Sequence, residues 1–341
     1  MNILVIGLPF FENTFRSMGH AVVNANSEYS DDLVMNHPQT WQSISKKLQS
    51  GGFEADFVLY VDNGNHPLFI DPHNIPVPSI YYSIDTYCNP WHIPYAHAFD
   101  MVLAAQKDFL PFFLNDGQNG KWLPLFCREA LCDVETPERD IPVSFVGTLG
   151  HKNNPQREPF LRKFAQYQPL DILSGDFVPI FSRSRIVLNQ TAFGEINFRC
   201  FEVMGLGAGL LMEKCGNGLD ELFTPGENIL PVYTRNDAAQ AARIAAIFLE
   251  RPAALEEIAK NGRELVKKEH TEVVRACQIL SIAEPLLSEN AAVKRLSELQ
   301  KYRRFTGTAF GMLASELSGE EWQPFRKLYC RIVEENYRDF Q

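Results

Sequence analysis

An arginine and a glutamate lie three residues apart in the segment NFRCFEVMGLGAG, residues 197–209. The apolar spacing around them predicts a short helix, on which residues three apart share one face. Backbone N–H groups that are free at the start of a helix attract anions. The guanidinium of Arg199 suits a diphosphate, and the carboxylate of Glu202 can accept both hydroxyls of a ribose. The pair makes a sugar-nucleotide site the leading hypothesis, and the residues alone leave a surface ion pair open as the alternative.

Gly147 and Thr148 stand between an expected strand and an expected helix. A glycine lets the backbone approach a phosphate closely, and a hydroxyl can donate a hydrogen bond to it. The alternative is an ordinary strand–helix turn. His151 and Arg157 follow, and each could face either the site or solvent.

The segment GNGL, residues 216–219, lies at a strand end and opens a short helix, so Gly218 and Leu219 could contact a phosphate or a sugar. It does not fit the pattern G-x-G-x-x-G. The glycines at 205–209 precede an expected strand instead of following one. Both facts argue against a dinucleotide-binding fingerprint, and so against a nicotinamide dehydrogenase.

Asp85 is the candidate catalytic base. It follows the apolar strand at 79–83, and α/β sheets place ligands at the carboxyl ends of their strands. An inverting transfer needs one carboxylate or imidazole to accept the proton of the acceptor hydroxyl. Asp85 could instead cap a turn. His92 is the second candidate, followed by His97 and His66, although a lone histidine is more often structural.

No D-x-D motif occurs in the sequence, and Asp31-Asp32 is an adjacent pair in a polar loop. We therefore expect chemistry without a metal or another cofactor, in which Arg199 and helix dipoles offset the charge of the leaving group. The seven cysteines form no CxxC pair, which disfavours a zinc site and favours reduced thiols in a cytoplasmic protein.

The chain has 341 residues, enough for two domains, and its net charge of -10 argues against a nucleic-acid partner. No basic leader precedes the first expected strand, and the longest apolar run, 203–212, is too short to cross a membrane. Short apolar runs alternate with helical patterns, which indicates parallel sheets, and a polar stretch at 133–142 indicates a linker. The expected strands are 2–6, 57–61, 79–83, 101–104, 121–125, 142–147, 170–173, 185–189, 209–212 and 229–232; the expected helices are 40–48, 106–114, 156–166, 198–206, 236–249, 252–268 and 271–287.

The last segment, roughly 290–341, carries an apolar stripe with helical spacing from Trp322 to Tyr337. Its simplest use is to pack on the protein's own surface. The nearby cations Lys301, Arg303 and Arg304 leave open a helix that contacts a partner or a membrane surface.

Several pieces of the second half, in order, resemble glycosyltransferases of the GT-B fold, specifically the spore-maturation (CgeB-like) group. The resemblance runs from about Val143 to Arg275. In the first half, PSIYYSID, residues 78–85, resembles a strand that ends in aspartate in many of these proteins. The matching pieces are SFVGT (144–148) with Arg157 downstream, SRIVLN (184–189), RCFEVMGLG (199–207), ELFTPGEN (221–228), IAKNGR (258–263) and HT (270–271) with Arg275.

This resemblance implies an α/β protein with two Rossmann-like domains that face each other across a cleft. Residues 1–135 would hold the acceptor and residues 140–288 the nucleotide sugar, while helices in 289–341 would cross back to the first domain. The strand that ends at Asn189 would join the donor site, together with Gly147, Thr148, Arg157, Arg199, Glu202, Gly218 and Leu219.

One feature departs from the family. Related retaining transferases carry two glutamates separated by seven residues, whereas Glu195 and Glu202 are separated by six and the matching earlier position is Gly194. Retaining chemistry therefore does not follow from the resemblance.

The expected activity is transfer of a sugar, of hexosyl type, from a nucleoside-diphosphate sugar to a hydroxyl of a glycan, lipid or protein. A nucleotide-sugar epimerase of the same fold and a non-catalytic sugar-nucleotide-binding subunit are the alternatives.

Overall fold

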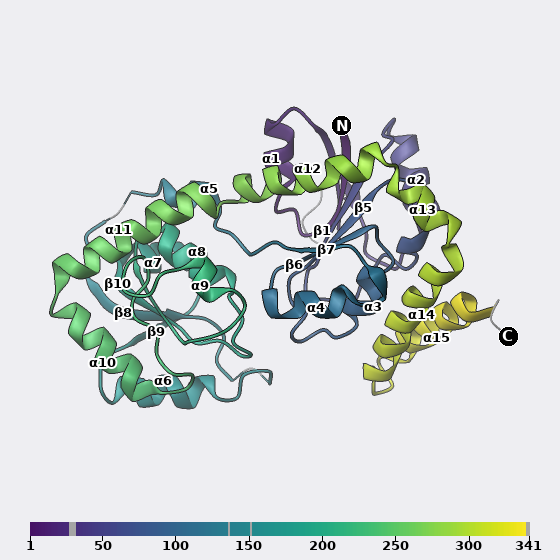
Figure 1. The fold of residues 1–341 in the computed structure, drawn as a ribbon. Helices are drawn as coiled ribbons and strands as arrows, with labels where there is room; N and C mark the ends of the chain where they lie inside the picture. Colours follow the sequence, from purple (N-terminus) through teal and green to yellow (C-terminus); the bar gives the residue numbers. More distant parts are fainter. Residues whose placement is uncertain (27–31, 136, 151, 339–341) are drawn as a thin grey trace. The chain divides into compact units, whose positions relative to one another are not determined.

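The computed structural model describes residues 1–26, 32–135, 137–150 and 152–338. Backbone contacts divide the chain into two compact units (Figure 1). The first unit combines Met1–Pro124 with Ala276–Gln341, and the second is Leu125–Arg275. Asp31 and His151 lie outside the described residues.

Among its described residues, the first unit has a sheet of seven parallel strands in the order β3-β2-β1-β4-β5-β6-β7. The central strands β1, β4 and β5 are almost completely buried, as expected for continuous apolar runs in a parallel sheet covered on both faces. The elements of this part are β1 Asn2–Gly7, α1 Glu12–Ser17, β2 Ala21–Asn26, β3 Leu33–Val34, α2 Trp41–Ser50, β4 Phe57–Val61, η1 Pro72–Asn74, β5 Ser79–Ser83, α3 His92–Ala96, β6 Met101–Ala104, η2 Lys107–Phe109, α4 Leu110–Phe113, η3 Asn115–Gly117 and β7 Gly120–Trp122.

Three expectations in this part need correction. The helix expected at 106–114 is a 3-10 turn followed by the short α4, and the strand expected at 121–125 ends at Trp122. Strands β2 and β3 were not expected at all, because β2 has the sequence AVVNAN and its buried asparagines break the apolar pattern. Helix α2 does form where expected, and Thr40 caps it by accepting a hydrogen bond from the Ser43 amide.

The second unit contains four parallel strands in the order β11-β10-β8-β9. Apolar side chains of β8, β10 and β11 form its core with the alanine face of α10 and the phenylalanines of α6. The elements are α5 Glu129–Cys132, β8 Ile141–Val146, α6 Arg157–Ala165, β9 Asp171–Leu173, α7 Val178–Arg183, β10 Ser184–Asn189, α8 Phe198–Gly205, β11 Gly209–Met212, α9 Leu219–Leu222, α10 Ala238–Leu249 and α11 Pro252–Glu269.

Two expectations for the second unit differ from the structure. No strand forms at 229–232 in the described chain: Leu230 donates to the carbonyl of Leu210, but Pro231 has no N–H with which to continue a ladder. The stretch at 133–142 belongs to the second unit, because Arg263 donates to the carbonyls of Cys132 and Val134.

The chain returns to the first unit through α12 Glu272–Ser288, followed by α13 Ala291–Ser297, α14 Leu299–Glu316 and α15 Gln323–Tyr337. Helices α14 and α15 lie side by side, and their apolar residues join the core of the first unit (Figure 1). Arg295 of α13, 1% exposed, donates to both carboxylate oxygens of Asp100. The C-terminal helices thus pack on the first unit, although Trp322 and Phe325 stay 45% and 40% exposed. In the described part of the chain, every helix is too short or too polar to cross a lipid bilayer.

Candidate functional site

Arg199 is the second residue of α8, and its guanidinium lies at the carboxyl edge of the second sheet. Nη1 donates to Oδ1 of Asn189 and Nη2 to the carbonyl of Val146, each at 2.8 Å. The guanidinium also lies over the ring of Phe145, 5.0 Å from its centroid. Burial, and then the charge of Arg157, lower the pKa of Arg199 to about 10. The group therefore stays charged at neutral pH, and its two acceptors orient it without neutralising it.

Gly147 directly follows β8 and lies against this guanidinium. A Cβ at this position would come within 2.8 Å of Nη2 of Arg199 and 3.1 Å of the ring of Phe145. A contact of 2.8 Å would force Nη2 to shift, so a side chain at position 147 would disturb the hydrogen bond from Nη2 to the carbonyl of Val146. The loop thus approaches Arg199 closely enough for one anion to contact both.

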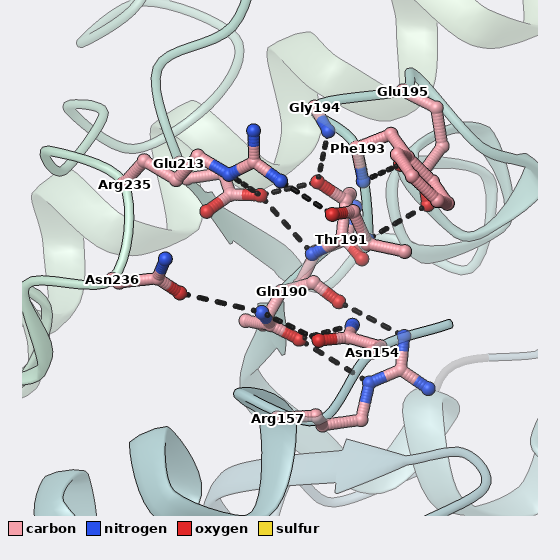
Figure 2. Close-up of polar contacts among 12 residues, drawn as sticks. Asn154, Arg157, Gln190, Thr191, Phe193, Gly194, Glu195, Glu213, Arg235 and Asn236 are labelled. Carbon is pink, nitrogen blue, oxygen red and sulfur yellow. Dashed lines mark hydrogen bonds and ion pairs between the residues drawn. The ribbon is translucent and has the colours of Figure 1, made fainter. Parts of the chain in front are cut away.

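Arg157 opens α6 and connects two strand ends. Nη1 donates to the carbonyl of Thr148 at 2.9 Å, while Nε donates to Oε1 of Gln190 at 3.2 Å. Asn154 Nδ2 donates to the same oxygen of Gln190 at 2.8 Å (Figure 2). Arg157 therefore holds the Gly147–Thr148 loop against the residue that follows β10.

Asn189 ends β10 and positions the start of α8. Its Oδ1 accepts from Arg199, while its Nδ2 donates to Oδ1 of Asn197 and to Sγ of Cys200, both at 3.1 Å. Its own carbonyl accepts from the hydroxyl of Tyr233 at 2.7 Å. With all these bonds made inside the protein, Asn189 orients Arg199.

Glu202 lies one helical turn after Arg199 and is partly buried. Burial raises the pKa of its carboxyl to about 7, against the opposing effects of Arg199 and Arg128. Both residues are described, and the structure places no ion pair between them. The guanidinium of Arg199 is instead oriented by Asn189 and the carbonyl of Val146. The carboxylate of Glu202 lies partly buried on the same helix.

Gly218 opens α9, which has only four residues, and the amide of Leu219 donates to the carbonyl of Gly216 at 3.1 Å. The side chain of Leu219 is buried. Leu219 thus serves the core, and its N–H already has an acceptor.

The structure adds a group of residues that the sequence interpretation missed (Figure 2). Glu213 follows β11 and is 0% exposed; its Oε1 accepts from the amide and hydroxyl of Thr191, and Nε of Arg235 lies 4.0 Å away. Burial raises the pKa of Glu213. Asp85 was selected because a ligand site is expected just after a buried strand. Glu213 directly follows β11, so the same rule would have selected Glu213.

Glu195 accepts hydrogen bonds from the amides of Ala192 and Phe193, at 3.2 and 2.8 Å (Figure 2). Its carboxylate therefore stabilises its own loop. Gly194, the matching position of the family's first glutamate, has no side chain, and its Cβ would lie 3.8 Å from Nη1 of Arg235.

In the first unit, Asp85 lies two residues beyond β5 and is partly exposed. Its Oδ1 accepts from the hydroxyl of Tyr87 at 2.8 Å. Oδ2 of the buried Asp62 accepts from the amides of Ile84 and Asp85, at 3.1 and 2.9 Å, and so fixes this turn.

His92 cannot meet an acceptor molecule in this structure, because it is 0% exposed. Its Nδ1 pairs with the hydroxyl of Ser83 at 2.9 Å, and its Nε2 lies 3.5 Å from Oδ1 of Asp62. Burial lowers the pKa of His92, although Asp62 opposes that shift. His97 is also buried, with Nε2 3.0 Å from the carbonyl of Phe113. His92 supports the turn below Asp85, a role that the spacing of histidines along the chain could not reveal.

Residues 128–281 match a family model described as glycosyl transferase-like. The comparison with curated protein sequences gives no match. Sucrose-phosphate synthase from Thermosynechococcus elongatus has a similar structure, with a TM-score of 0.62 and 10% identity over 85% of this chain and 100% of that chain. HepE from Anabaena, solved with UDP and glucose, has a TM-score of 0.61 and 14% sequence identity, over 84% of this chain and 100% of that chain. A glycosyltransferase from Rickettsia africae has a TM-score of 0.60 and 10% sequence identity, over 84% of this chain and 98% of that chain.

These similarities define the fold. Each unit is a Rossmann-like α/β domain, and the chain has the GT-B architecture of its structural neighbours, as the sequence predicted.

Proposed function

We propose that this protein is a glycosyltransferase that moves a sugar from a nucleoside-diphosphate sugar to an acceptor hydroxyl. The observation that carries the proposal is the charged guanidinium of Arg199. Gly147 lies against it, and within the described residues its hydrogen-bond acceptors, Oδ1 of Asn189 and the carbonyl of Val146, are uncharged. A buried cation beside an exposed turn attracts a dianionic group such as a diphosphate. The match of residues 128–281 to the glycosyl transferase-like model supports this reading.

The geometry of the second unit supports the donor-site roles that we propose. Arg199 and the Gly147–Thr148 loop bind the diphosphate, and Glu202 accepts the ribose hydroxyls. Arg157 and Asn189 position those groups, because their hydrogen bonds go to the Thr148 carbonyl and to Arg199. Leaving-group charge is offset by the guanidinium without a metal.

Asp85 is the proposed base for the acceptor hydroxyl. Asp62 fixes its turn by accepting from the amides of Ile84 and Asp85, and Asp85 is partly exposed, whereas His92 is buried. A base must come within hydrogen-bonding reach of the proton it removes. Asp85 satisfies the requirement of access better than the buried His92, so it stays the first candidate for the base.

The proposed family group and donor rest on sequence motifs and on similar solved structures, and the proposed location rests on the cysteines. The order of motifs between Val143 and Arg275 supports the spore-maturation (CgeB-like) group. HepE was solved with UDP-glucose as well as with UDP, which makes a uridine-diphosphate hexose the first donor to test. Cysteines without disulfides fit a cytoplasmic location.

The test measures thermal shift and calorimetry with UDP, GDP, dTDP, CDP, ADP and their sugars. One nucleotide should stabilise the wild-type protein, and Glu202→Ala should abolish that shift. Glu257→Ala, which removes an exposed glutamate of α11, is the matched control and should keep it. Excess EDTA should leave turnover unchanged.

Two outcomes would point elsewhere. If no nucleotide stabilises the protein, the proposal fails, and a non-catalytic subunit becomes the better explanation. If the nucleotide sugar alone is converted to an isomer without any acceptor, the protein is an epimerase.

A further inference from the structure

A cavity lies in the second unit, at the edge of its sheet opposite to the proposed donor residues. Arg139 stands two residues before β8, Arg185 is the second residue of β10, and Gly207 stands two residues before β11. The donor residues Gly147 and Asn189 lie at the other ends of these strands. A strand of six residues spans about 20 Å, so the two sites are separate.

This cavity has a volume of about 500 Å³, within the range of about 300–1,000 Å³ that holds small organic ligands. One face of α11 forms a wall, because its lining residues recur at helical spacing. The lining residues are Pro137, Arg139, Arg185, Gly207, Pro252, Leu255, Glu256, Ala259, Lys260 and Arg263.

The lining carries a strong positive charge. Arg139, Arg185, Lys260 and Arg263 contribute four positive charges, and Glu256 contributes one negative charge, a formal excess of three. The whole chain, by contrast, has a net charge of -10. Concentrating cations in a concave site of an acidic protein creates a local field that favours anions.

Arg139 is held rigidly in this cavity. Its Nη1 donates to the carbonyls of Phe181 and Ser184, at 3.1 and 2.5 Å, and its Nη2 donates to the carbonyl of Leu206 at 2.8 Å. Carbonyl oxygens carry no net charge, so they orient the guanidinium and leave its charge uncompensated. Burial, and then the charge of Arg263, lower the pKa of Arg139 to about 10.

Gly207 keeps the space between these arginines open. A Cβ there would lie 3.2 Å from Nη2 of Arg139 and 3.6 Å from Nη1 of Arg263. The backbone of Gly207 also has a φ of +71°, which favours glycine. Two guanidiniums thus lie next to one small opening. Arg185 also lines the cavity, and its Nη2 donates to the carbonyl of Leu249 at 3.1 Å.

We propose that this cavity binds a small soluble phosphorylated molecule with at least two negative charges, separately from the donor site. Guanidiniums bind phosphate oxygens through paired N–H donors, and Lys260 adds a point charge. The apolar side chains of Pro137, Pro252, Leu255 and Ala259 offer contact to the carbon skeleton of such a molecule.

Calorimetry on the full chain tests this proposal, with fructose 1,6-bisphosphate as the probe and fructose as the neutral control. We expect one site per chain for the bisphosphate and none for fructose. Arg185→Gln and Lys260→Glu should each weaken binding about tenfold or more. Lys268→Glu is the matched control, because Lys268 lies on the same helix but outside the cavity, and it should change affinity less than about twofold.

The Arg199→Ala variant separates this proposal from the proposed function. It should lose nucleotide binding and keep bisphosphate binding. The proposal is overturned if the wild-type protein does not bind the bisphosphate, if the control weakens binding as much as the cavity variants, or if Arg199→Ala removes bisphosphate binding. Circular dichroism of every variant excludes unfolding as the cause of lost binding.

Discussion

Ionisation of Glu202 should control the affinity for a nucleotide sugar near neutral pH. Burial raises the pKa of this carboxyl to about 7, although Arg199 and Arg128 oppose that shift. An ionised carboxylate accepts hydrogen bonds from both ribose hydroxyls, whereas a protonated carboxyl has lost part of its acceptor capacity. Because the pKa is raised, the protonated form dominates below about pH 7, and binding should strengthen as the pH rises through that value.

The size of the effect follows from the ionised fraction. If only the ionised form binds, the apparent affinity scales with that fraction. For a pKa of about 7, the fraction rises from about 3% at about pH 5.5 to about 97% at about pH 8.5. The affinity should therefore increase about 30-fold across this interval, which corresponds to about 2 kcal/mol.

Calorimetry with UDP-glucose is the appropriate assay. Its diphosphate is esterified at both ends, so it lacks the terminal phosphate group that titrates near pH 6 in UDP. Glu202→Gln should bind more weakly at high pH and show a nearly flat profile, whereas Glu257→Gln should retain the wild-type profile. A wild-type affinity that stays constant within about twofold would refute the reasoning, as would a slope that persists in Glu202→Gln.

Three further substitutions test other parts of the structure. Gly147→Ala should weaken nucleotide binding about tenfold in calorimetry, because its Cβ would lie 2.8 Å from Nη2 of Arg199; unchanged affinity would contradict the close approach. Asp85→Asn should lower kcat at least about 100-fold while the dissociation constant of the donor stays the same, and a normal kcat would exclude Asp85 as the base. Arg295→Met should reduce the free energy of unfolding by about 3–5 kcal/mol in urea titration, because it leaves the buried carboxylate of Asp100 with hydrogen bonds from Ser79 but no cation; a loss below about 1 kcal/mol would contradict that account.

Much of the architecture could be predicted from local patterns. The strands at 2–6, 57–61 and 79–83 and the helix at 198–206 follow from apolar runs and helical spacing, and the structure has β1, β4, β5 and α8 at these places. The placement of Arg199 and Glu202 on one face of a helix also depends only on their spacing of three residues. Such features are local, so the backbone geometry of a single element is enough to determine them.

Irregular elements were predicted less well. The helix expected at 106–114 divides into a 3-10 turn and the short α4, and Pro231 interrupts the strand expected at 229–232. The buried asparagines of β2 concealed a strand. Apolar pattern alone does not show whether a polar side chain will find a buried partner. Asn24 does so in this fold, by donating to the carbonyl of Val5.

The sequence by itself determined the two-domain α/β class, the apolar strands and the local Arg199–Glu202 face. Only the tertiary structure decided that Arg199 meets the carbonyl of Val146, 53 residues earlier in the chain, and that Arg295 pairs with Asp100 across 195 residues. It also decided that His92 is buried and that Arg139, Arg185 and Arg263 line one cavity. The physical reason is that burial and charge contacts depend on which distant segments pack together, and no local spacing encodes that packing.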